Sequence, residues 1–478
     1  MSYLSNTKKT KIVATVGPAS SDYATLLQMA RAGVDVFRLN FSHGTHDQHL
    51  EVIKHICYIN ETYRYHVSIL ADLQGPKLRV GEMENGGVEI SEGDIITFTN
   101  EKCIGTKEKV YMSYKDFARD VNVNERVRID DGKLELVVVE TDKKSEVKLK
   151  VVFGGILKSR KGVNLPNTDI SLPCLTAKDL VDLDFILTQP VHWIALSFVR
   201  SAADMEDLRE RVEAKGHEAK ILAKVEKPEA LRHLDAVIDA SDAIMVARGD
   251  LGVEVPIEKL PRVQKDIIQR CIQKARPVIV ATQMMESMIT NFSPTRAEVT
   301  DVANAVIDGT DAVMLSGETS VGNHPVKVVQ AMSNIIREAE KLEEVHYKGL
   351  VPNPAIESFL ADAICYNTCK IAGEIGARAV IGMTNSGYTA FKIASNRPNS
   401  RIYIFSQNET MLSILNLVWG IRAFYYDKYA STDDTIHDVQ QILKDKQLLE
   451  SGDVVINTGS MPIQKRLRTN MLKITKIE

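Results

Sequence analysis

The chain has 478 residues, of which 44% are hydrophobic and 26% are charged, and its formal net charge is −4. A chain of this length exceeds what one compact core accommodates, so we expect about two to four domains. The small negative charge gives no general attraction to nucleic acid or to anionic membranes, so we expect neither as a partner. The N-terminus lacks the apolar core of a signal peptide and no apolar run could span a bilayer, so we expect a cytoplasmic protein.

The six cysteines are scattered along the chain and form no Cys-x-x-Cys pair. Cys365 and Cys369 stand four residues apart, the spacing of neighbours on one helix face. That spacing permits a metal or redox pair, but buried thiols are the commoner explanation. The pattern favours the reducing interior of a cell.

Short apolar runs recur along the chain, and most are followed by a stretch of helical length. In chain order the runs are KIVATV (11–16), VDVFRLN (34–40), VSILAD (67–72), HWIALS (192–197), ILAKVE (221–226), AIMVA (243–247), PVIVAT (277–282) and DAVMLS (311–316). Between the last two runs, Thr295 and Glu298 form a capping box and Gly309 follows the apolar stripe, which predicts a helix. Apolar strands that alternate with helices are typical of a parallel sheet buried on both faces. Eight such runs predict a (β/α)8 TIM barrel, an α/β fold.

About a hundred residues of different character separate the third and fourth runs. Here VEISEGDIITFT, RVRIDDGKLELVVVE and SEVKLKVVF alternate apolar and polar residues, and Asp131-Gly132 is a hairpin signal. We predict a small inserted β-barrel domain over residues 74–170, at the rim of a barrel formed by residues 1–73 and 171–347. A lid over an active site and a passive decoration are both open at this point.

After about residue 348 the alternation of helices and strands resumes with new partners. AIESFLADAICYNTCKIAGEIG predicts a helix, and RAVIGMT, AFKIASN, RIYIFS, IRAFYYD, DVVINT and NMLKITKI follow with further helices. We predict an independent open α/β domain over residues 348–478. Its loop TNSGYT (384–389) stands between a strand and a helix, where backbone N–H groups can hold a phosphate, although a plain turn is equally consistent.

Polar residues stand at or just past the carboxyl ends of the predicted barrel strands. They are Thr15, Asn40, Ser42, Asp72, Ser197, Lys224, Glu226, Asp250, Thr282, Ser316 and Glu318. Any one of them could be a cap or a turn former, but the active sites of such barrels lie at this rim. Because side chains alternate along a strand, Lys224 and Glu226 point to the same side. The set therefore predicts an active site.

Two carboxylates and a lysine at neighbouring strand ends suit a metal-assisted reaction. Glu226 and Asp250 are ligands of the kind that a hard divalent cation such as Mg²⁺ prefers. A lysine beside that metal would face negative charge developing on a substrate. A structural ion pair between Lys224 and Glu226 is the alternative.

Arginine and glycine residues add an affinity for anions to this rim. Arg38 and Arg79 supply cations suited to phosphate, and Gly249 lets the backbone approach a ligand and offers its N–H group. Together with the metal site they indicate phosphoryl transfer or enolate chemistry. The chain has neither a GxxxxGK[ST] loop nor a GxGxxG fingerprint, so a nucleotide would be held differently. The histidines of HGTHDQH (43–49) lie outside the usual zinc spacings.

Several segments, in order along most of the chain, resemble signature segments of pyruvate kinases. They are TKIVATVGPAS, FRLNFSHG, DLQGPKLRVG, KGVNLP, ALSFVR, KVEKPE, IMVARGDLGVE, ATQMMESM, PTRAEVTDVANAV and MLSGETSVG. The resemblance implies phosphoryl transfer from phosphoenolpyruvate to ADP with Mg²⁺ or Mn²⁺, the final step of glycolysis, which gives pyruvate and ATP. It also implies a homotetramer of subunits with a catalytic barrel, a lid and a regulatory C-terminal domain.

The resemblance also implies roles for particular residues. Lys224 resembles the family lysine that stabilises the transferring phosphoryl group and the enolate, and Arg38 resembles the arginine that grips the phosphate. Glu226 and Asp250 resemble the metal ligands. Further substrate contacts are implied for Ser197, Gly249, Asp250 and Thr282, the last near the carbon that is protonated. Nucleotide contacts are implied for Asn40, Ser42, His43, Arg79 and Lys161.

Many members of the family need K⁺, which is held by residues that match Asn40, Ser42, Asp72 and Leu73 with a glutamate nearby. Here Lys77, in DLQGPKLRVG, stands where those enzymes have the glutamate. The combination resembles the K⁺-independent branch, because an ammonium group could supply the fixed charge that K⁺ supplies elsewhere. We therefore predict that activity does not require K⁺.

The C-terminal loop departs from the regulated members of the family. Those enzymes often carry an arginine or lysine in the segment that matches TNSGYT, whereas Tyr388 stands at that position here. The predicted effector site comprises Thr384, Asn385, Ser386, Gly387 and Thr389. A sugar phosphate or AMP is the expected class of effector, and its identity stays open.

Two other functions compete with a pyruvate kinase. A Mg²⁺-dependent barrel aldolase or lyase would also place a lysine and carboxylates at strand ends, but the inserted domain with Arg79 and Lys161 argues against it. A catalytically silent scaffold is the other alternative, and the presence of Lys224, Glu226 and Thr282 argues against it.

Overall fold

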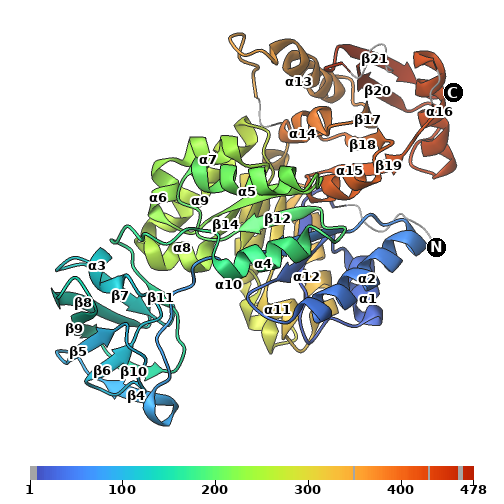
Figure 1. The fold of residues 1–478 in the computed structure, drawn as a ribbon. Helices are drawn as coiled ribbons and strands as arrows, with labels where there is room; N and C mark the ends of the chain where they lie inside the picture. The colour runs from blue at the N-terminus through green and yellow to red at the C-terminus, as the bar shows by residue number, and fades with distance from the viewer. Residues whose placement is uncertain (1–7, 348–349, 429–430, 461–466) are drawn as a thin grey trace.

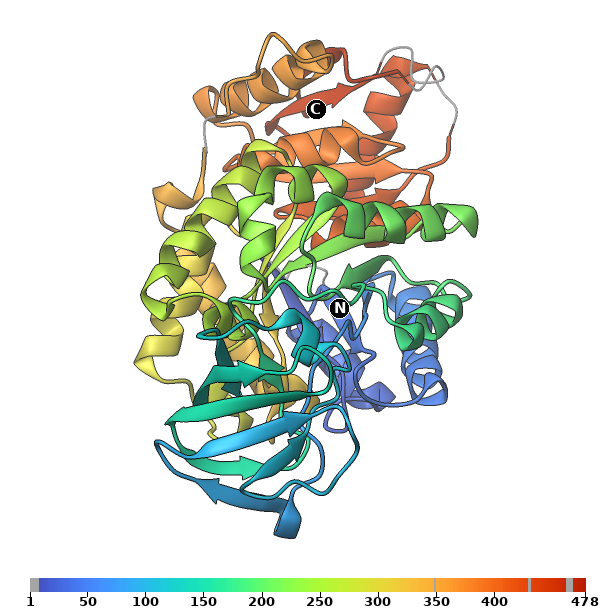
Figure 2. The same ribbon diagram turned by 60° about the vertical axis from the view of Figure 1, so that its left-hand side comes forward.

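The structure is a computed structural model that describes residues 8–347, 350–428, 431–460 and 467–478. It consists of a central barrel with an inserted β domain and a C-terminal α/β domain. The two smaller parts lie at opposite ends of the barrel in both ribbon views (Figures 1 and 2). Among the helices of the described residues, none combines the length and the apolar character that crossing a bilayer requires.

The central barrel confirms all eight predicted strands, whose ends differ from the prediction by at most two residues. The strands are β1 (Lys11–Thr15), β2 (Val36–Asn40), β3 (Ser68–Asp72), β12 (Trp193–Leu196), β13 (Lys220–Val225), β14 (Ala243–Ala247), β15 (Val278–Ala281) and β16 (Ala312–Leu315). They close in the order β1-β16-β15-β14-β13-β12-β3-β2, and every neighbouring pair is parallel. All carboxyl ends therefore meet at one rim.

Helices surround the barrel and connect its strands. The longer ones are α1 (Tyr23–Ala32), α2 (His46–Tyr63), α4 (Ala177–Ile186), α5 (Ala202–Ala214), α9 (Leu260–Gln273), α10 (Arg296–Asp308) and α12 (Pro325–Ala339). The short helices are α6 (Pro228–Arg232), α7 (Leu234–Ala240), α8 (Arg248–Glu254) and α11 (Gly317–Ser320). The predicted capping box is present at α10, where Thr295 and Glu298 bond each other's backbone, and Gly309 ends the helix with φ 100°. Sequence signals therefore fixed this helix at both ends.

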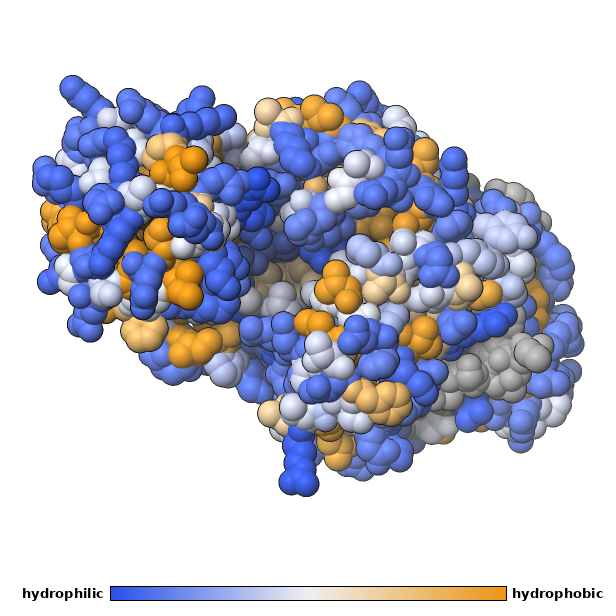
Figure 3. Space-filling view, turned by 90° about the horizontal axis from the view of Figure 1, so that it is seen from below, coloured by the Kyte–Doolittle hydropathy of each residue, from blue (hydrophilic) through white to orange (hydrophobic). Residues whose placement is uncertain are grey.

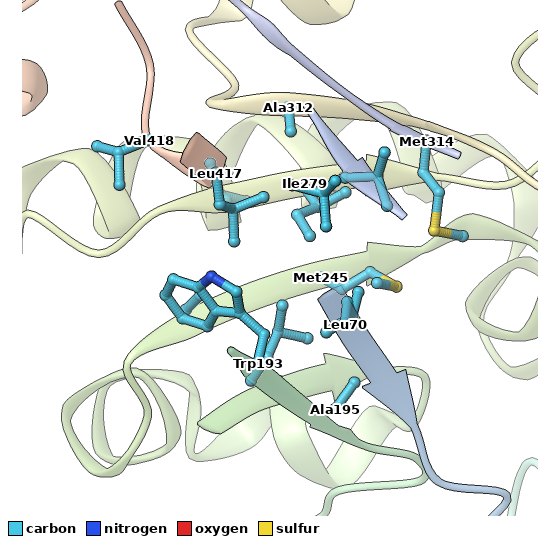
Figure 4. Packing of buried hydrophobic residues seen from close by; sticks show 14 of the residues in the cluster. Leu70, Trp193, Ala195, Met245, Ile279, Ala312, Met314, Leu417 and Val418 are labelled. Atoms are coloured by element: carbon cyan, nitrogen blue, oxygen red, sulfur yellow. The ribbon is translucent and has the colours of Figure 1, made fainter. Parts of the chain in front are cut away.

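Apolar side chains fill the barrel interior (Figure 4). Leu70, Met245 and Met314 are buried there, and Trp193 lies at the amino end of β12. Leu417, from the C-terminal domain, packs near Trp193, whose Nε1 donates to the carbonyl of Ile414 at 3.3 Å. The C-terminal domain thus closes the amino end of the barrel, and the opposite end stays available for a site.

The insertion between β3 and α4 is an all-β domain, as predicted. Its strands are β4 (Gly87–Ile90), β5 (Ile95–Thr99), β6 (Lys109–Tyr111), β7 (Arg126–Ile129), β8 (Leu134–Thr141), β9 (Glu146–Phe153), β10 (Gly155–Lys158) and β11 (Val163–Asn164), with one short helix, α3 (Phe117–Asp120). Hydrogen bonding divides them into a six-stranded sheet, β11-β7-β8-β9-β5-β6, and a two-stranded sheet, β10-β4. The predicted Asp131-Gly132 turn joins β7 to β8, with φ 56° and 84°.

The C-terminal domain is the predicted open α/β unit. Its elements are α13 (Phe359–Glu374), β17 (Ala379–Met383), α14 (Tyr388–Ser395), β18 (Arg401–Ser406), α15 (Glu409–Ile414), β19 (Ile421–Tyr425), α16 (Thr432–Asp445), β20 (Val454–Gly459) and β21 (Met471–Lys476). The sheet order is β19-β18-β17-β20-β21, and only the β20–β21 pair is antiparallel. AFKIASN lies in α14, the helix that follows the TNSGYT loop.

Candidate active site

Lys224 and Glu226, at the carboxyl end of β13, lie together in a cluster of polar side chains. Lys224 Nζ lies 2.8 Å from Glu226 Oε1 and 3.4 Å from Asp72 Oδ1, and it donates to Ser197 Oγ at 2.7 Å. These residues come from the carboxyl ends of β3, β12 and β13, which are neighbours in the barrel. The fold therefore gathers three polar side chains around one ammonium group.

Arg38, on β2, joins this cluster through Asp72. Its Nη2 and Nε lie 2.6 and 2.7 Å from Asp72 Oδ2, and its Nη1 donates to Thr15 Oγ1 at 2.9 Å. The Asp72 side chain is 1% exposed, whereas those of Arg38 and Lys224 keep 10% and 12%. Asp72 therefore holds Arg38 and Lys224 in fixed positions, and both cations stay partly accessible at the rim.

Burial and neighbouring charge shift the pKa values of this cluster. Burial alone would lower the pKa of Lys224, but the carboxylates of Asp72 and Glu226 outweigh it and raise that pKa above its ordinary value. Burial alone would raise the pKa of Asp72, yet Lys224 and Arg38 lower it. Burial raises the pKa of Glu226 to about 7, although Lys224 opposes that rise. Lys224 therefore stays charged at neutral pH. The charged form of Glu226 is only partly stabilised by Lys224, and further positive charge nearby would stabilise it.

Glu226 and Asp250 have the features of a divalent-metal site. Glu226 Oε2 accepts the N–H group of Phe198 at 2.7 Å, which orients the carboxylate, and the negative charge of Asp250 contributes to its raised pKa. Asp250 lies in the first turn of α8, and its carboxylate forms no hydrogen bond or ion pair with the described residues. A buried carboxylate beside a half-buried one that has no described partner fits a hard cation that takes its other ligands from substrate and water. No group of three or more acidic, histidine or cysteine side chains suited to a metal occurs in the described ranges.

Thr282 has a strained backbone, and its side chain contacts Gly249, the residue before Asp250. Thr282 follows β15 with φ 71°, an unusual backbone conformation for a β-branched residue. Its Oγ1 accepts the N–H group of Gly249 at 2.7 Å, and its carbonyl accepts from Arg248 Nη2 at 2.7 Å. A Cβ atom at Gly249 would lie 3.4 Å from Thr282 Oγ1. Strain maintained by such contacts is typical of functional positions.

The predicted nucleotide contacts fall into two groups. Asn40, Ser42 and His43 form the turn after β2, where Asn40 Oδ1 accepts the N–H group of Ser42 at 3.1 Å. Arg79 and Lys161 lie on adjacent segments of the inserted domain, since the N–H group of Val80 donates to the Lys161 carbonyl at 3.0 Å. Arg79 Nη1 donates to the carbonyl of Arg160 at 3.0 Å, and Lys161 Nζ lies 2.8 Å from Asp130.

The two groups are electrostatic neighbours. Burial lowers the pKa of His43, and the positive charges of Lys77 and Arg79 lower it further. Lys77 is exposed, and among the described residues its ammonium group has no hydrogen-bond partner. At the predicted K⁺ position, the carbonyl of Leu73 accepts from Ser197 Oγ at 2.7 Å.

A cleft separates the inserted domain from the barrel rim, and Figure 3 shows the hollow between these two parts. The insertion contributes Asp131, Gly162 and Asn164, the barrel contributes Phe198, Lys227 and Asp250, and Lys77 also lines the cleft. The inserted domain therefore lies over the rim that carries the cluster.

Sequence reasoning missed several residues of this cleft. Asn164 Nδ2 donates to Glu254 Oε1 at 2.9 Å, and Lys227 Nζ lies 2.7 Å from the same oxygen. Both belong to segments already singled out, KGVNLP and KVEKPE, so those segments held a signal for them. The sequence did not indicate the N–H group of Phe198, because the position of a backbone donor cannot be seen in a pattern of side chains.

Some polar rim and histidine residues have structural partners instead. Glu318 is buried, which raises its pKa, and it accepts the N–H groups of Met285 at 3.1 Å and Ser316 at 2.7 Å. His46 Nε2 lies 2.8 Å from Asp182, and His49 Nε2 donates to the His43 carbonyl at 3.0 Å. The side chains of His46 and His49 are thus engaged within the fold. Cys365 and Cys369 are buried thiols of α13.

The TNSGYT loop lies in the C-terminal domain at the amino end of α14. Gly387 has φ 86°, and its N–H group donates to Thr384 Oγ1 at 3.0 Å. Asn385 and Ser386 are exposed. Thr389 is buried and shares a 2.5 Å hydrogen bond with Thr469, and Tyr388 donates its hydroxyl to Asp362. The exposed part of the predicted effector site is therefore narrower than the segment.

Comparisons with known proteins show the family of the chain. The family description "Pyruvate kinase, barrel domain" matches residues 7–329, and "Pyruvate kinase, alpha/beta domain" matches residues 362–475. The pyruvate kinase of Corynebacterium glutamicum is 43% identical, over 98% of this chain and 97% of its own. That of Mycobacterium tuberculosis is 40% identical, over 98% and 99%. A crystal structure of a pyruvate kinase from Cryptosporidium parvum superposes with a TM-score of 0.92 at 34% identity, covering 98% of this chain and 96% of that one. The chain belongs to the pyruvate kinase family.

Proposed function

We propose that this chain transfers the phosphoryl group of phosphoenolpyruvate to ADP, giving pyruvate and ATP as the final step of glycolysis. One observation carries the proposal. Asp72 holds Arg38 and Lys224 side by side at the rim, with the carboxylate of Glu226 2.8 Å from Lys224. Phosphoryl transfer needs fixed positive charge around the moving group more than it needs covalent chemistry.

Each member of the cluster then has a role. Arg38 grips the phosphate of phosphoenolpyruvate, because a guanidinium group matches two phosphate oxygens. Lys224 neutralises the charge that develops on the transferring group and on the enolate oxygen, and Ser197 positions it. The substrate lies against Gly249, Asp250 and Thr282. We assign Thr282 to the side of the enolate carbon that takes up the proton.

Glu226 and Asp250 are the residues that would hold the divalent metal implied by the family, Mg²⁺ or Mn²⁺ in our proposal. When bound, the metal supplies positive charge that polarises the phosphoryl and carboxylate oxygens of the substrate. Phe198 keeps Glu226 in orientation through its N–H group. Asp250 has its carboxylate free of other described partners, which supports the assignment.

We propose three domains with separate tasks. Residues 1–73 and 171–347 form the catalytic barrel, residues 74–170 form the lid, and residues 348–478 form a regulatory domain. The nucleotide phosphates lie between the two groups of contacts described above, with Asn40, Ser42 and His43 on the barrel side and Arg79 and Lys161 on the lid. Closure of the lid would exclude water that competes with ADP for the phosphoryl group.

We further propose that Lys77 replaces the K⁺ ion that many relatives require. Its ammonium group has no described partner, and its charge acts on His43 within the same region as Arg38. K⁺ would otherwise be held by Asn40, Ser42, Asp72 and Leu73. Against that arrangement, the Asp72 carboxylate is already bound to two cations.

Regulation, assembly and location complete the proposal. A sugar phosphate or AMP would bind at Thr384, Asn385, Ser386, Gly387 and Thr389, with the exposed Asn385 and Ser386 as its first contacts. The assembly is a cytoplasmic homotetramer.

The test is pyruvate formation from phosphoenolpyruvate and ADP with Mg²⁺, run in parallel with K⁺ and with tetramethylammonium at constant ionic strength. Turnover in both salts supports the function and the role of Lys77. Turnover with K⁺ alone keeps the function and removes that role. No turnover of a folded protein in either salt overturns the proposed function.

A matched pair of variants ties turnover to the cluster. Lys224→Met should lower kcat by roughly 10²–10³-fold, the usual effect of removing a preorganised electrostatic group. Lys220→Met, at the amino end of the same strand, is the control and should keep wild-type turnover. Equal activity of the two variants would show that Lys224 has no part in the chemistry.

A further inference from the structure

A second cavity, which we call the junction cavity, lies between the barrel and the C-terminal domain. Its volume is about 480 Å³, which is within the usual range of small-molecule sites. Its barrel side includes Lys9 and residues at and after the end of α12, and its other side includes the end of α13 and Arg401 at the start of β18. None of its described lining residues belongs to the rim cluster or to the loop 384–389.

The lining of the junction cavity is strongly basic. Its cationic side chains are those of Lys9, Arg337, Lys341, Arg378 and Arg401. Glu340 is the one acidic residue among its described lining, and its carboxylate already accepts the N–H groups of Lys9 at 2.8 and 2.9 Å and of Thr10 at 2.5 Å. Of the exposed cations, Lys341 pairs with Glu338 at 2.6 Å and Arg378 lies 4.0 Å from Asp453. The described lining thus holds five cationic side chains and one acidic side chain.

Lys9 gives the cavity a buried donor. The residue is 8% exposed, and its Nζ donates to the carbonyls of Asn399 at 2.7 Å and Pro398 at 3.1 Å. Its Nζ also lies 5.0 Å from the centroid of the Trp419 ring, so Lys9 contributes its charge to the cavity. Burial lowers the pKa of Lys9 to about 7, and an anion in the cavity would raise it again.

A glycine lies in the lining of the cavity. Gly376, just after α13, has φ 61°, and a Cβ atom there would meet nothing within 4 Å. The backbone at this exposed position is therefore not covered by other protein atoms. The shape and the charge thus both leave room for a ligand.

We propose that the junction cavity binds a small-molecule anion through its phosphate group. Guanidinium and ammonium groups match phosphate oxygens, and they are supplied here from two domains. A ligand in this position contacts the barrel through Lys9 and Lys341 and the C-terminal domain through Arg378 and Arg401. Its binding therefore stabilises the junction itself.

The test measures binding without turnover, so its outcome does not depend on the proposed catalysis, and the cavity variants separate this site from the effector loop. The full chain is titrated calorimetrically with inorganic phosphate, AMP and ribose 5-phosphate, which separates recognition of the phosphate group alone from recognition of a nucleotide or a sugar phosphate. The double variant Arg378→Gln with Lys341→Gln removes two exposed charges and should weaken binding by about ten-fold or more. Lys215→Gln with Lys473→Gln, two exposed lysines outside the cavity, changes the net charge equally and should leave binding unchanged.

A second variant guards against an indirect effect of charge. Gly376→Asn keeps every charge, and asparagine tolerates a positive φ, so this variant should fold and still weaken binding by occupying the cavity. Absence of binding of all three probes at millimolar concentration overturns the proposal. So does binding that survives both cavity variants, or binding that is lost in Arg38→Gln, because either result assigns the anion to another site.

Discussion

The inserted domain and the C-terminal domain are attached to the barrel in opposite ways. The insertion has a hydrophobic core of its own, built from residues such as Phe98, and this core is separate from that of the barrel. The C-terminal domain shares one continuous core with the barrel, to which both Leu417 and Trp193 belong. A second, smaller core lies within the C-terminal domain and includes Phe405.

The polar contacts repeat this difference. The insertion meets the barrel through contacts at the cleft, such as Asn164 to Glu254 and Arg128 to the Val253 carbonyl. At the other end, Arg397 is 1% exposed and lies 2.9 Å from the buried Asp311. A single partly buried hydrogen bond costs about 1 kcal/mol to remove, whereas a buried ion pair with its partner removed costs several times more. The inserted domain, with a separate core, is thus attached as a movable lid would be, and the C-terminal domain, with a shared core, is attached as a fixed part of the barrel.

The largest expected effect is at the buried junction. Arg397→Met leaves Asp311 uncompensated and should lower the free energy of unfolding by about 3–5 kcal/mol. Urea denaturation followed by circular dichroism checks this, with the exposed Arg468→Met as the control. A separate early transition of the C-terminal domain, with the barrel transition unmoved, would contradict a shared core.

A deletion in the core of the insertion should be equally costly but local. Phe98 is fully buried, and Phe98→Ala should destabilise the inserted domain by about 3–5 kcal/mol. Hydrogen exchange followed by mass spectrometry should then show faster exchange in β5, β8 and β9, with β12 to β14 unchanged. Phe153→Ala, at a side chain that is 66% exposed, is the control in the same domain. Equal acceleration in the barrel strands would mean that the two cores unfold together.

The junction should also gain stability with rising pH. Burial lowers the pKa of Lys9 to about 7 in the folded chain, from 10.5 for an ordinary lysine. Below pH 7 both states carry the proton and the folded state bears the full cost of burying the charge. Above it the folded state loses the proton first, so the free energy of unfolding rises by up to about 1.4 kcal/mol per pH unit until the unfolded lysine also titrates. Chemical denaturation between pH 7 and 9 checks this, and Lys9→Met should remove the slope that Lys215→Met retains.

The smallest effect is expected at the contact between the insertion and α8. Asn164→Ala removes one hydrogen bond, about 1 kcal/mol, from that contact while Lys227 stays paired with Glu254. We expect a several-fold higher KM for ADP with an unchanged melting temperature. Asn122→Ala, an exposed asparagine of the same domain, is the control. A lower melting temperature with unchanged KM would assign Asn164 a structural role alone.

The sequence predicted the barrel and most of the rim because those signals are local. Eight apolar runs marked the strands, and the carboxyl ends of parallel strands must meet, which placed Arg38, Lys224 and Glu226 together. Asp72 was placed at the rim and assigned to a K⁺ position, but its bridging role was not predicted, because that role depends on side-chain rotamers of β2 and β13. No pattern in the sequence indicated the junction cavity, because Lys9 and Arg401 come together only through the packing of two domains.

The closure of the barrel by Leu417 has a consequence for how the chain folds during synthesis. Leu417, which covers the amino end of the barrel, is synthesised long after Trp193, and the hydrogen bond from Trp193 to Ile414 spans 221 residues. On the ribosome the insertion can complete its own core early. The amino end of the barrel stays uncovered until the C-terminal domain emerges. We expect nascent chains that end before residue 415 to be the forms that chaperones hold longest.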